Sequence, residues 1–419
     1  MTVATIIYDA TGGSDTAASG SGPATAITGA SATNGAGNVV NLDGAPLLSF
    51  ASNSVLWVNS AAGNRHLSRI TAVNDIAKTV TTEDLLTLGA GVSWAVGGKR
   101  KTLEADTTRR DFLDGKAGWT YSLEAGTYTL TGAPVLPAVG DTTSGELAIV
   151  AASGAAPVIS WTGDHAGLTV VSGTHLRLAG LTLSNTTSVD LNTIGVRLAS
   201  GTIYVEIADC TIRTAGNCIN STVTVIGSIR GCDLKSTHGE GIDLDGASSV
   251  SILNNSIHEC GLVRAVAGEG VGIKLDLSTG TCGCVVIGNI IRDNYASGIT
   301  LKSSSPLVMA AVLNNVIHDN GADGIYLTGA LAATYRAMLV NNLITNNGGY
   351  GINVNSTSGG DMAVWNDNNG FRGNANGEVL NVTKGAASLT LAADPYYDEA
   401  VDNYTLDPGG ASVDAGYGY

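Results

Sequence analysis

The chain has 419 residues, a formal net charge of −15 and a pI near 4.6. This excess of acidic residues argues against nucleic acid and anionic membranes as main partners, because both are bound through basic surfaces. Only 14% of the residues are charged and 5% are aromatic, while glycine numbers 56, so we expect a core of Val, Ile, Leu and Ala rather than large rings. No apolar stretch approaches the ~18 residues of a membrane-spanning helix, so no membrane insertion is expected.

The first hundred residues predict a small antiparallel β-domain. A run rich in Gly, Ala and Ser leads into short alternating stretches such as NVVNL, SVLWVNS and VSWAVGG. Alternation of this kind, with turn residues in between, is typical of antiparallel strands. We therefore assign residues 1–102 to an N-terminal β-rich domain suited to docking. Neither a basic segment nor a long apolar segment follows Met1, which predicts that no signal peptide is present.

A junction and an N-terminal cap are expected over residues 103–133. Five basic residues gather around its start: Lys99, Arg100, Lys101, Arg109 and Arg110. They form either a solvated junction or a binding site for an acidic partner. A short helix ahead of the stretch WTYSL would cover the first coil of the region that follows, since an open coil exposes an unpaired strand edge.

The stretch from residue 250 to residue 355 repeats one phrase four times. It reads VSILNNSIHEC, VVIGNIIRDN, AVLNNVIHDN and MLVNNLITNN, and each copy precedes a short strand: GIKL, GITL, GIYL and GINV. The copies are spaced 34, 26 and 27 residues apart at their first asparagines, which are Asn255, Asn289, Asn315 and Asn342. Strand-like units with such a period predict a solenoid, here an all-β, right-handed parallel β-helix over residues 134–385. Asparagine suits it, because Asn tolerates a left-handed corner and stacked amides can hydrogen-bond along the axis.

The six cysteines all lie in the predicted β-helix. Alignment of the coils puts Cys210 and Cys232 in the column of Asn255. We interpret them as space-filling thiols at a corner rather than as disulfides. Cys282 and Cys284 are too close together for an ordinary bridge and lack the second pair of a metal site.

The coils from residue 117 onward resemble the parallel β-helix repeat family, which includes pectate lyase-like proteins and many phage tail proteins. The tail resembles the recurrent ending of that superfamily, in which an Asp-Pro and an aromatic residue precede a Tyr-x-Leu, a Pro-Gly turn and an Asp-Ala-Gly. The matching residues are Asp394, Pro395, Tyr396, Tyr404, Leu406, Pro408, Gly409, Asp414, Ala415 and Gly416. The resemblance implies the fold over residues 117–419, not an activity. Residues 386–419 are expected to cap the far end of the helix.

Chemistry would be carried by the strand after each coil glycine, whose alternate side chains point outward and form two stacked columns. The first column is Arg197, Asp243, Lys274, Thr300, Tyr326 and Asn353. The second is Ala199, Asp245, Asp276, Lys302, Thr328 and Asn355. Asp245 and Asp276 would stack about 5 Å apart, a separation that suits a pair of catalytic carboxylates.

The candidate catalytic residues are therefore Asp243, Asp245 and Asp276. Lys274 in the first column, and His238 and Glu240 at the corner before Asp243, are candidate auxiliaries. The same stripe of alternating acids and lysines is equally typical of a solvated surface with no function.

Signatures of known β-helix enzymes occur only as fragments. Polygalacturonases of the superfamily carry Asn-Thr-Asp, Asp-Asp, Gly-His-Gly and Arg-Ile-Lys on successive coils, and this chain has only His238-Gly239 and Ile273-Lys274. Pectate lyases combine a calcium-binding acid cluster with a basic residue, and Arg197 is not beside such a cluster. His258 and His318 share a loop position but Arg292 interrupts them, so we interpret them as solvated residues rather than metal ligands. We expect no metal and no cofactor.

Three functions are compatible with the sequence. The favoured one is a structural virion protein of a bacteriophage: a tail spike, fibre or capsid decoration. It would be a rigid β-helix rod that contacts host glycan, joins other virion proteins through residues 1–102 and forms a homotrimer. The alternative is a polysaccharide-degrading lyase or glycoside hydrolase that uses the aspartate face. The third is an extracellular bacterial surface adhesin.

Overall fold

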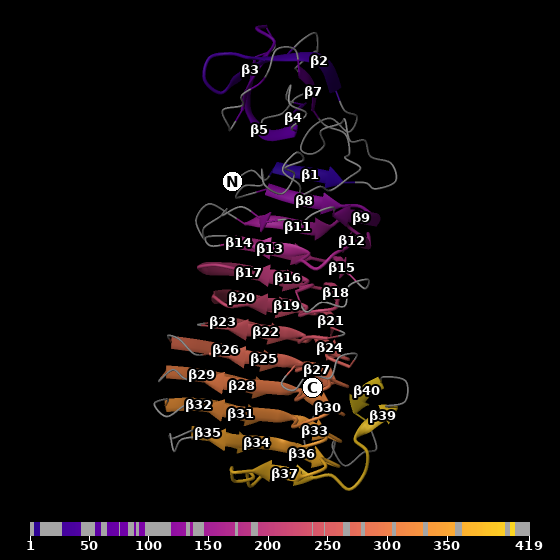
Figure 1. The fold of residues 1–419 in the computed structure, drawn as a ribbon, viewed down its shortest axis with the longest axis vertical. Coiled ribbons are helices and arrows are strands. Elements are labelled where there is room, and N and C mark those ends of the chain that lie inside the picture. Colours follow the sequence, from indigo (N-terminus) through magenta and orange to yellow (C-terminus); the bar gives the residue numbers. More distant parts are fainter. Residues whose placement is uncertain are drawn as a thin grey trace. The chain divides into compact units, whose positions relative to one another are not determined.

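The computed structural model describes residues 4–8, 27–42, 55–59, 65–74, 76–82, 88, 92–96, 119–130, 135–136, 146–171, 175–185, 192–236, 238–246, 248–262, 269–277, 281–303, 307–329, 334–356, 363–398 and 403–406. These residues form strands and turns (Figure 1). None of the described segments is a helix long and apolar enough to cross a membrane. The chain divides into two compact units, residues 1–162 with 166–184 (unit 1) and residues 163–165 with 185–419 (unit 2).

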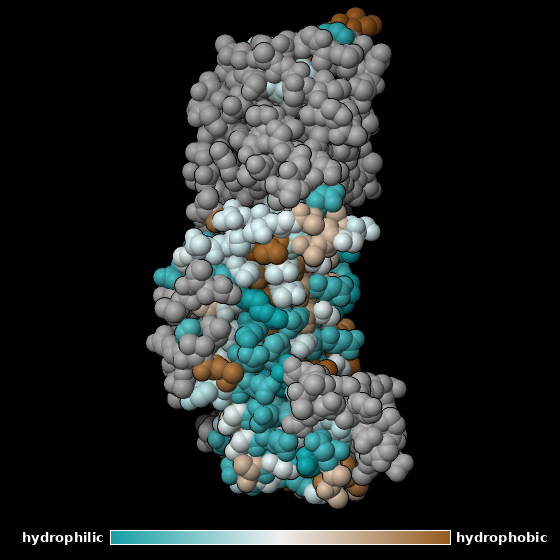
Figure 2. Space-filling view, turned by 90° about the vertical axis from the view of Figure 1, so that its right-hand side faces the viewer, coloured by the Kyte–Doolittle hydropathy of each residue, from teal (hydrophilic) through white to brown (hydrophobic). Residues whose placement is uncertain are grey.

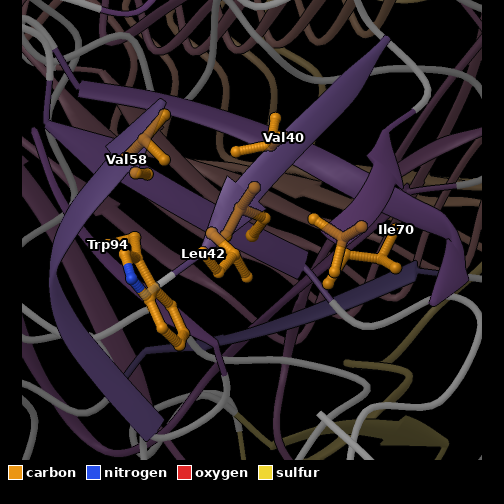
Figure 3. Close-up of a cluster of buried hydrophobic side chains, with 8 residues drawn as sticks. Val40, Leu42, Val58, Ile70 and Trp94 are labelled. Atoms are coloured by element: carbon orange, nitrogen blue, oxygen red, sulfur yellow. The ribbon is translucent and has the colours of Figure 1, made fainter. Parts of the chain in front are cut away.

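Unit 1 contains a closed antiparallel barrel, which confirms the predicted N-terminal β-structure. Its strands pair in the order β2-β3-β6-β5-β4-β7. Their bounds are β2 (Ile27–Asn34), β3 (Val39–Leu42), β4 (Val55–Asn59), β5 (Arg65–Asn74), β6 (Thr79–Thr82) and β7 (Val92–Val96). Alternation decides which side chains point inward: in β3, Val40 and Leu42 are buried and Asn41 is exposed. Val58, Ile70 and Trp94 complete the core around them (Figure 3).

Unit 1 also contains the first coils of a parallel β-helix. One sheet has the order β1-β8-β11-β14, a second β9-β12-β15 and a third β10-β13. The strands are β1 (Ala4–Tyr8), β8 (Trp119–Leu123), β9 (Gly126–Leu130), β10 (Val135–Leu136), β11 (Leu147–Ala151), β12 (Pro157–Trp161), β13 (Leu168–Val170), β14 (His175–Ala179) and β15 (Thr182–Ser184). Large rings fill these coils, contrary to expectation, since Trp119, Tyr121, Tyr128 and Trp161 are all buried.

Strand β1 covers the edge of the first coil of the β-helix. Strand β1 pairs in parallel with β8, so that Ala4 lies opposite Trp119 and Tyr8 opposite Leu123. We had assigned residues 1–102 to one N-terminal domain, but β1 belongs to a β-helix sheet. The short helix expected before Trp119 falls outside the described residues.

Unit 2 is a parallel β-helix of three sheets. Sheet I comprises β17 (Thr202–Ala208), β20 (Thr224–Arg230), β23 (Ser248–Leu253), β26 (Thr281–Ile287), β29 (Leu307–Leu313), β32 (Thr334–Val340) and β35 (Ala363–Asp367). Sheet II comprises β18 (Thr211–Thr214), β21 (Asp233–Ser236), β24 (Ser256–His258), β27 (Ile290–Arg292), β30 (Val316–His318), β33 (Leu343–Thr345), β36 (Gly370–Arg372) and β38 (Leu389–Thr390). Sheet III comprises β16 (Val196–Leu198), β19 (Ile219–Ser221), β22 (Ile242–Asp245), β25 (Ile273–Asp276), β28 (Ile299–Ser303), β31 (Ile325–Gly329), β34 (Tyr350–Ser356) and β37 (Gly377–Leu380).

The core of unit 2 consists of aliphatic side chains stacked coil on coil. In sheet I, Ile252, Val286, Val312 and Leu339 follow one another in register, and all are fully buried. Each buried side chain of this kind stabilises the fold by about 1.5–3 kcal/mol relative to exposure. The predicted aliphatic core is confirmed here, with Phe371 as a large ring among the fully buried side chains.

The predicted asparagine column is a hydrogen-bonded ladder between sheets I and II. Asn255 donates from Nδ2 to Asn289 Oδ1 at 2.9 Å, and Asn289 to Asn315 at 2.9 Å. The chain of amides continues through Asn342 to Asn369 at 3.0 Å per step. Each Oδ1 also accepts a backbone N–H of the neighbouring coil, as from Asn289 to Asn315. The ladder thus satisfies buried backbone groups at a corner where no strand can pair them.

A second ladder, which we did not predict, runs along the next corner. It links Asn294, Asn320, Asn347 and Asn374 through amide hydrogen bonds of 2.8, 2.9 and 2.8 Å. Each member lies five residues after a member of the first ladder, so the signal was present in the repeated phrase.

The left-handed residue at the first corner is the one before each ladder asparagine, not the ladder asparagine itself. Asn254, Asn314, Asn341 and Asn368 have φ between 53° and 60°. Gly288, with φ of 68°, takes this place in the coil of β26. Our expectation had assigned both roles to one residue, whereas the chain divides them between two neighbours.

Thiols replace asparagine in the earlier coils. Cys232 donates its backbone N–H to Asn255 Oδ1 at 2.9 Å, which confirms its predicted place in the column. Cys260 holds the equivalent position at the second corner, through Asn294 Oδ1. The five described cysteine side chains are buried and form no disulfide: Cys210, Cys218, Cys232, Cys260 and Cys284. The Cys282 side chain lies outside the described residues.

The tail forms a hairpin that packs on the flank of sheet II. Strands β39 (Tyr396–Asp398) and β40 (Asn403–Leu406) pair in antiparallel fashion, beside β30 and β33 (Figure 1). Their rings meet the outward side chains of Val316 and Leu343. Among the described residues of the tail, β38 extends sheet II by pairing with β36.

The same hairpin buries His318, which we had expected to be solvated. Only 1% of His318 is exposed, and its ring contacts Tyr396 and Tyr404 at centroid distances of 5.2 and 5.5 Å. His318 Nδ1 lies 2.8 Å from Thr345 Oγ1, which in turn lies 2.7 Å from the Tyr396 hydroxyl. The expectation was wrong because a segment from far along the chain covers this loop.

We predict that Asn315→Ala lowers the free energy of unfolding by ~2–4 kcal/mol, because it leaves the buried backbone N–H and side-chain amide of Asn289 without their acceptor. Urea unfolding followed by circular dichroism measures this change. The control is Asn355→Ala on the exposed outer face, for which we expect a change within about 0.5 kcal/mol. Equal losses in the two variants would contradict the assigned role of the ladder.

Candidate functional site

The strand register of sheet III assembles the predicted outward columns. Asp243 lies opposite Lys274 and Asp245 opposite Asp276, on the adjacent strands β22 and β25. Lys274 is followed by Thr300 and Asp276 by Lys302. On the other neighbouring strand, β19, Asn220 lies opposite Asp243. Our alignment of the coils had not included Asn220 in the first column.

Asp243 is held as a buried, multiply bonded carboxylate. Its residue is only 6% exposed. Its Oδ2 accepts hydrogen bonds from the Asn217 and Asn220 amides at 3.0 and 3.3 Å, and its Oδ1 lies 3.1 Å from Lys274 Nζ. Two amide donors and one ammonium group thus fix the orientation of this carboxyl group.

Glu240 lies at the corner immediately before β22 and is 5% exposed. Its backbone N–H donates to Asn217 Oδ1 at 3.0 Å, so one asparagine orders both Glu240 and Asp243. Burial, and next the negative charge of Asp243, raise the pKa of Glu240 to about 7, against the opposing charge of Lys274. A carboxyl group with this pKa can both donate and accept a proton near neutrality.

Asp245 and Asp276 form a second pair of carboxyl groups on the same face. Lys302 Nζ lies 2.5 Å from Asp276 Oδ2, while Asp276 Oδ1 and Asp245 Oδ1 are buried without a hydrogen-bond partner among the described residues. Burial, with the charges of Asp243 and Asp276, raises the pKa of Asp245. Buried acceptors without donors are costly in a protein that has no use for them.

Glu269 joins this face, although the sequence analysis had missed it. Its Oε2 is buried without a described hydrogen-bond partner, and its charge contributes to the raised pKa of Glu240. Its position before a glycine at the corner of the next coil could have indicated it. The structure describes the chain up to Leu262 and again from Glu269 onward.

The two remaining auxiliaries differ in what they contribute. Lys274 lies among the acids, and although burial acts against it, the charges of Asp243 and Glu240 raise the pKa of its ammonium group. His238 is 5% exposed, and its backbone N–H donates to the Ala215 carbonyl at the same corner. The structure therefore brings Lys274 into contact with a candidate acid and gives His238 a buried corner position.

The face is not the fully solvated stripe that we had considered as its alternative. Lysines do alternate with aspartates along the two columns, as in such a stripe. However, Glu240 and Asp243 are almost entirely buried. An isolated buried carboxylate is expensive, so this arrangement maintains a proton-binding group at a cost to stability.

Sheet II carries a second charged column, and its members pair with each other. The side of unit 2 that bears this sheet is largely hydrophilic (Figure 2). Its ion pairs are Arg213 with Asp233, Lys235 with Glu259, Arg292 with Asp293 and Arg372 with Asp394. We interpret the column as a structural surface.

His258 belongs to this paired column and is not the solvated residue that we expected. It is 8% exposed, with Nε2 at 2.9 Å from Asp233 Oδ1 and Nδ1 at 3.2 Å from Glu259 Oε1. Burial acts to raise the pKa of Asp233, but hydrogen bonds from His258 and Arg213 lower it to about 2. Among the described residues, no group of three or more His, Cys, Asp or Glu side chains is arranged to hold a metal ion.

Comparison with known proteins identifies the repeat region. Residues 179–376 match the family model of the right-handed β-helix region, which agrees with the resemblance drawn from the repeats. No curated protein sequence matches the chain.

Several solved structures resemble the chain at low identity. Pectate lyase Pel9A shares 12% identity over 72% of this chain and 83% of its own, with a TM-score of 0.47. The A-module of the Azotobacter vinelandii mannuronan C-5 epimerase AlgE4 shares 15% over 65% and 90%, with a TM-score of 0.35. The catalytic domain of a GH87 α-1,3-glucanase in complex with nigerose shares 10% over 88% of each chain, with a TM-score of 0.36. Likenesses of this degree carry no argument about substrate.

We predict that Glu240→Gln makes the protein more stable above pH 7. A raised carboxyl pKa means that the folded state binds the proton more tightly than the unfolded state, so stability falls as the pH rises from about 4.5 to about 7. The glutamine variant should lack this fall and exceed the wild type by about 1–3 kcal/mol at pH 8.

Urea unfolding at pH 5 and pH 8 measures the effect. Glu206→Gln in sheet I, which removes a carboxyl group paired with Arg230, is the control and should keep the wild-type pH dependence. A Glu240→Gln variant that loses stability equally at both pH values would show that Glu240 is an ordinary structural carboxylate.

Proposed function

Since this chain carries the right-handed β-helix repeat of that family, we propose that it is a polysaccharide-cleaving enzyme with its active site on the outer face of sheet III. The observation that carries the proposal is Glu240, a buried carboxyl group whose pKa is raised to about 7 and which shares Asn217 as a hydrogen-bond partner with Asp243. A carboxyl group whose pKa lies near neutrality suits general acid–base catalysis.

The roles follow from the contacts. Glu240 protonates the oxygen of the leaving sugar, because it still holds a proton near neutrality. Asp243, fixed by two amides and Lys274, supplies the negative charge that stabilises the developing cation at the sugar carbon or activates the attacking water. Asp245 and Asp276, which lie opposite each other on β22 and β25, place two further carboxyl groups beside this pair.

Hydrolysis fits this face better than elimination. Abstraction of a proton from carbon requires a base that is unprotonated at working pH. Lys274 does not suit that role, since the charges around it raise its pKa. The carboxyl groups can instead perform both halves of a hydrolytic reaction.

The enzymatic reading displaces the virion protein that we had favoured from the sequence. A structural rod requires no buried group that titrates near neutrality, and it gains stability when such a group is removed. Docking through the N-terminal barrel, a homotrimer and a place in a virion or at a cell surface remain proposals that are independent of this site.

The test is incubation of the protein with bacterial and plant polysaccharides, followed through new reducing ends and through the absorbance of unsaturated products. We predict that the protein releases new reducing ends from at least one glycan and that no unsaturated products appear. Glu240→Gln and Asp243→Asn should each lower kcat by about 10²–10⁴-fold, the usual contribution of a general acid or base.

Asp293→Asn, immediately after β27 of sheet II, is the matched control, because it removes a carboxylate whose partner is Arg292 and should retain full activity. The formation of unsaturated products would show that the enzyme cleaves by elimination and not by hydrolysis. Activity that survives both site substitutions, or its absence across the whole panel, would overturn the proposal.

A further inference from the structure

The outer face of sheet I turns apolar in its last four coils. One outward column holds Val285, Ala311, Met338 and Trp365 in register. The next holds Gly283, Met309, Arg336 and Ala363. Trp365 is 61% exposed, Met309 64% and Met338 38%. Together these residues line a shallow groove of about 680 Å³.

This face is not an extension of the core, because the same column is polar in earlier coils. Ser228 and Ser251 precede Val285 in register, and all three point outward. The aliphatic side chains that stabilise the coils lie on the inner side of the sheet. A local apolar patch on an otherwise polar surface is typical of a binding site.

The dimensions of the patch favour a ligand chain over a second copy of the protein. Four strands about 4.8 Å apart and seven residues of ~3.3 Å each give an area of roughly 450 Å². A stable contact between two proteins buries about 800 Å² on each partner. Strands β26, β29 and β32 are each paired on both sides, so over them the face offers side chains rather than a free strand edge.

Arg336 gives the groove a positive charge. The residue is exposed and has no ion-pair partner among the described residues, unlike the paired cations of sheet II. It lines the same groove as Trp365, one strand away and displaced by two residues. A guanidinium group in this setting is suited to a carboxylate.

A second groove shares Trp365 with the first. Its volume is about 620 Å³, and its lining is mixed, with Asn381, Thr383, Lys384 and Asp367 as well as Val354, Val364 and Val382. Trp365 therefore lines both an apolar groove and one that also carries amide and hydroxyl groups. A sugar ring has the same division, with an apolar face of C–H groups and an edge of hydroxyls.

We propose that the outer face of sheet I is a second binding site, distinct from the acid face of sheet III, and that it holds a chain of carboxylate-bearing sugars. One sugar ring stacks on Trp365, its hydroxyl groups reach the second groove, and the carboxylate of a neighbouring sugar pairs with Arg336. The negative charges of sheet III are placed on another face and do not oppose this ligand.

The experiment uses the full chain with E240Q, so that the probes are not cleaved, and measures binding by isothermal titration calorimetry. The probes are polygalacturonate and alginate oligosaccharides, with dextran as the neutral glycan. We expect W365A to weaken binding of the acidic probes by about tenfold or more, as for other stacking platforms. R336Q should weaken it about five- to tenfold and abolish the preference over dextran.

Y295A is the matched control, since Tyr295 is an exposed ring (39%) at another corner, and it should bind as E240Q does. Thermal melting checks that each variant is folded. The proposal is overturned if neither acidic probe binds, if dextran binds equally well, or if W365A and R336Q bind normally. It is also overturned if sedimentation reveals an oligomer that W365A dissociates, because the face would then be an interface between copies. Binding is read without catalysis, so this outcome is separate from that of the proposed enzyme activity.

Discussion

The buried amide ladders are the interaction on which the rest of unit 2 depends. Each ladder asparagine bonds the next coil through its side chain and also accepts a backbone N–H, as Asn289 and Asn315 show. A shift of one residue would break both bonds and turn an outward side chain into the core. The ladders therefore hold successive coils in one register over several turns, and every stacked column on the outer faces follows from that register.

On sheet III the fixed register concentrates carboxyl groups that would repel each other in solution. Asn217 and Lys274 bind the Asp243 carboxyl group, and burial, with the charge of Asp243, raises the pKa of Glu240 to about 7. This arrangement of carboxyl groups is unfavourable by itself, and the packing of the rest of the fold offsets its free-energy cost. On sheet I the same register gathers Trp365 and Arg336 beside one groove.

The repeated phrase was sufficient to predict the β-helix, the first ladder and the partners of Asp245 and Lys274, because a period translates directly into stacking. It could not predict what lies far apart in sequence. Strand β1 joins a sheet more than a hundred residues away, and the tail hairpin buries His318. It could not rank the acids either, since the pKa of Glu240 depends on burial that one coil alone does not determine.

The central claim is that sheet III holds a carboxyl group poised near neutrality rather than a set of ordinary surface acids. Carbon-13 NMR of protein labelled at the glutamate carboxyl positions measures this directly. The account predicts one glutamate resonance that titrates with a midpoint near pH 7 and is absent from Glu240→Gln. If every glutamate titrated below pH 5 in the folded protein, Glu240 would be an ordinary carboxylate and the assignment of an active site to this face would be wrong.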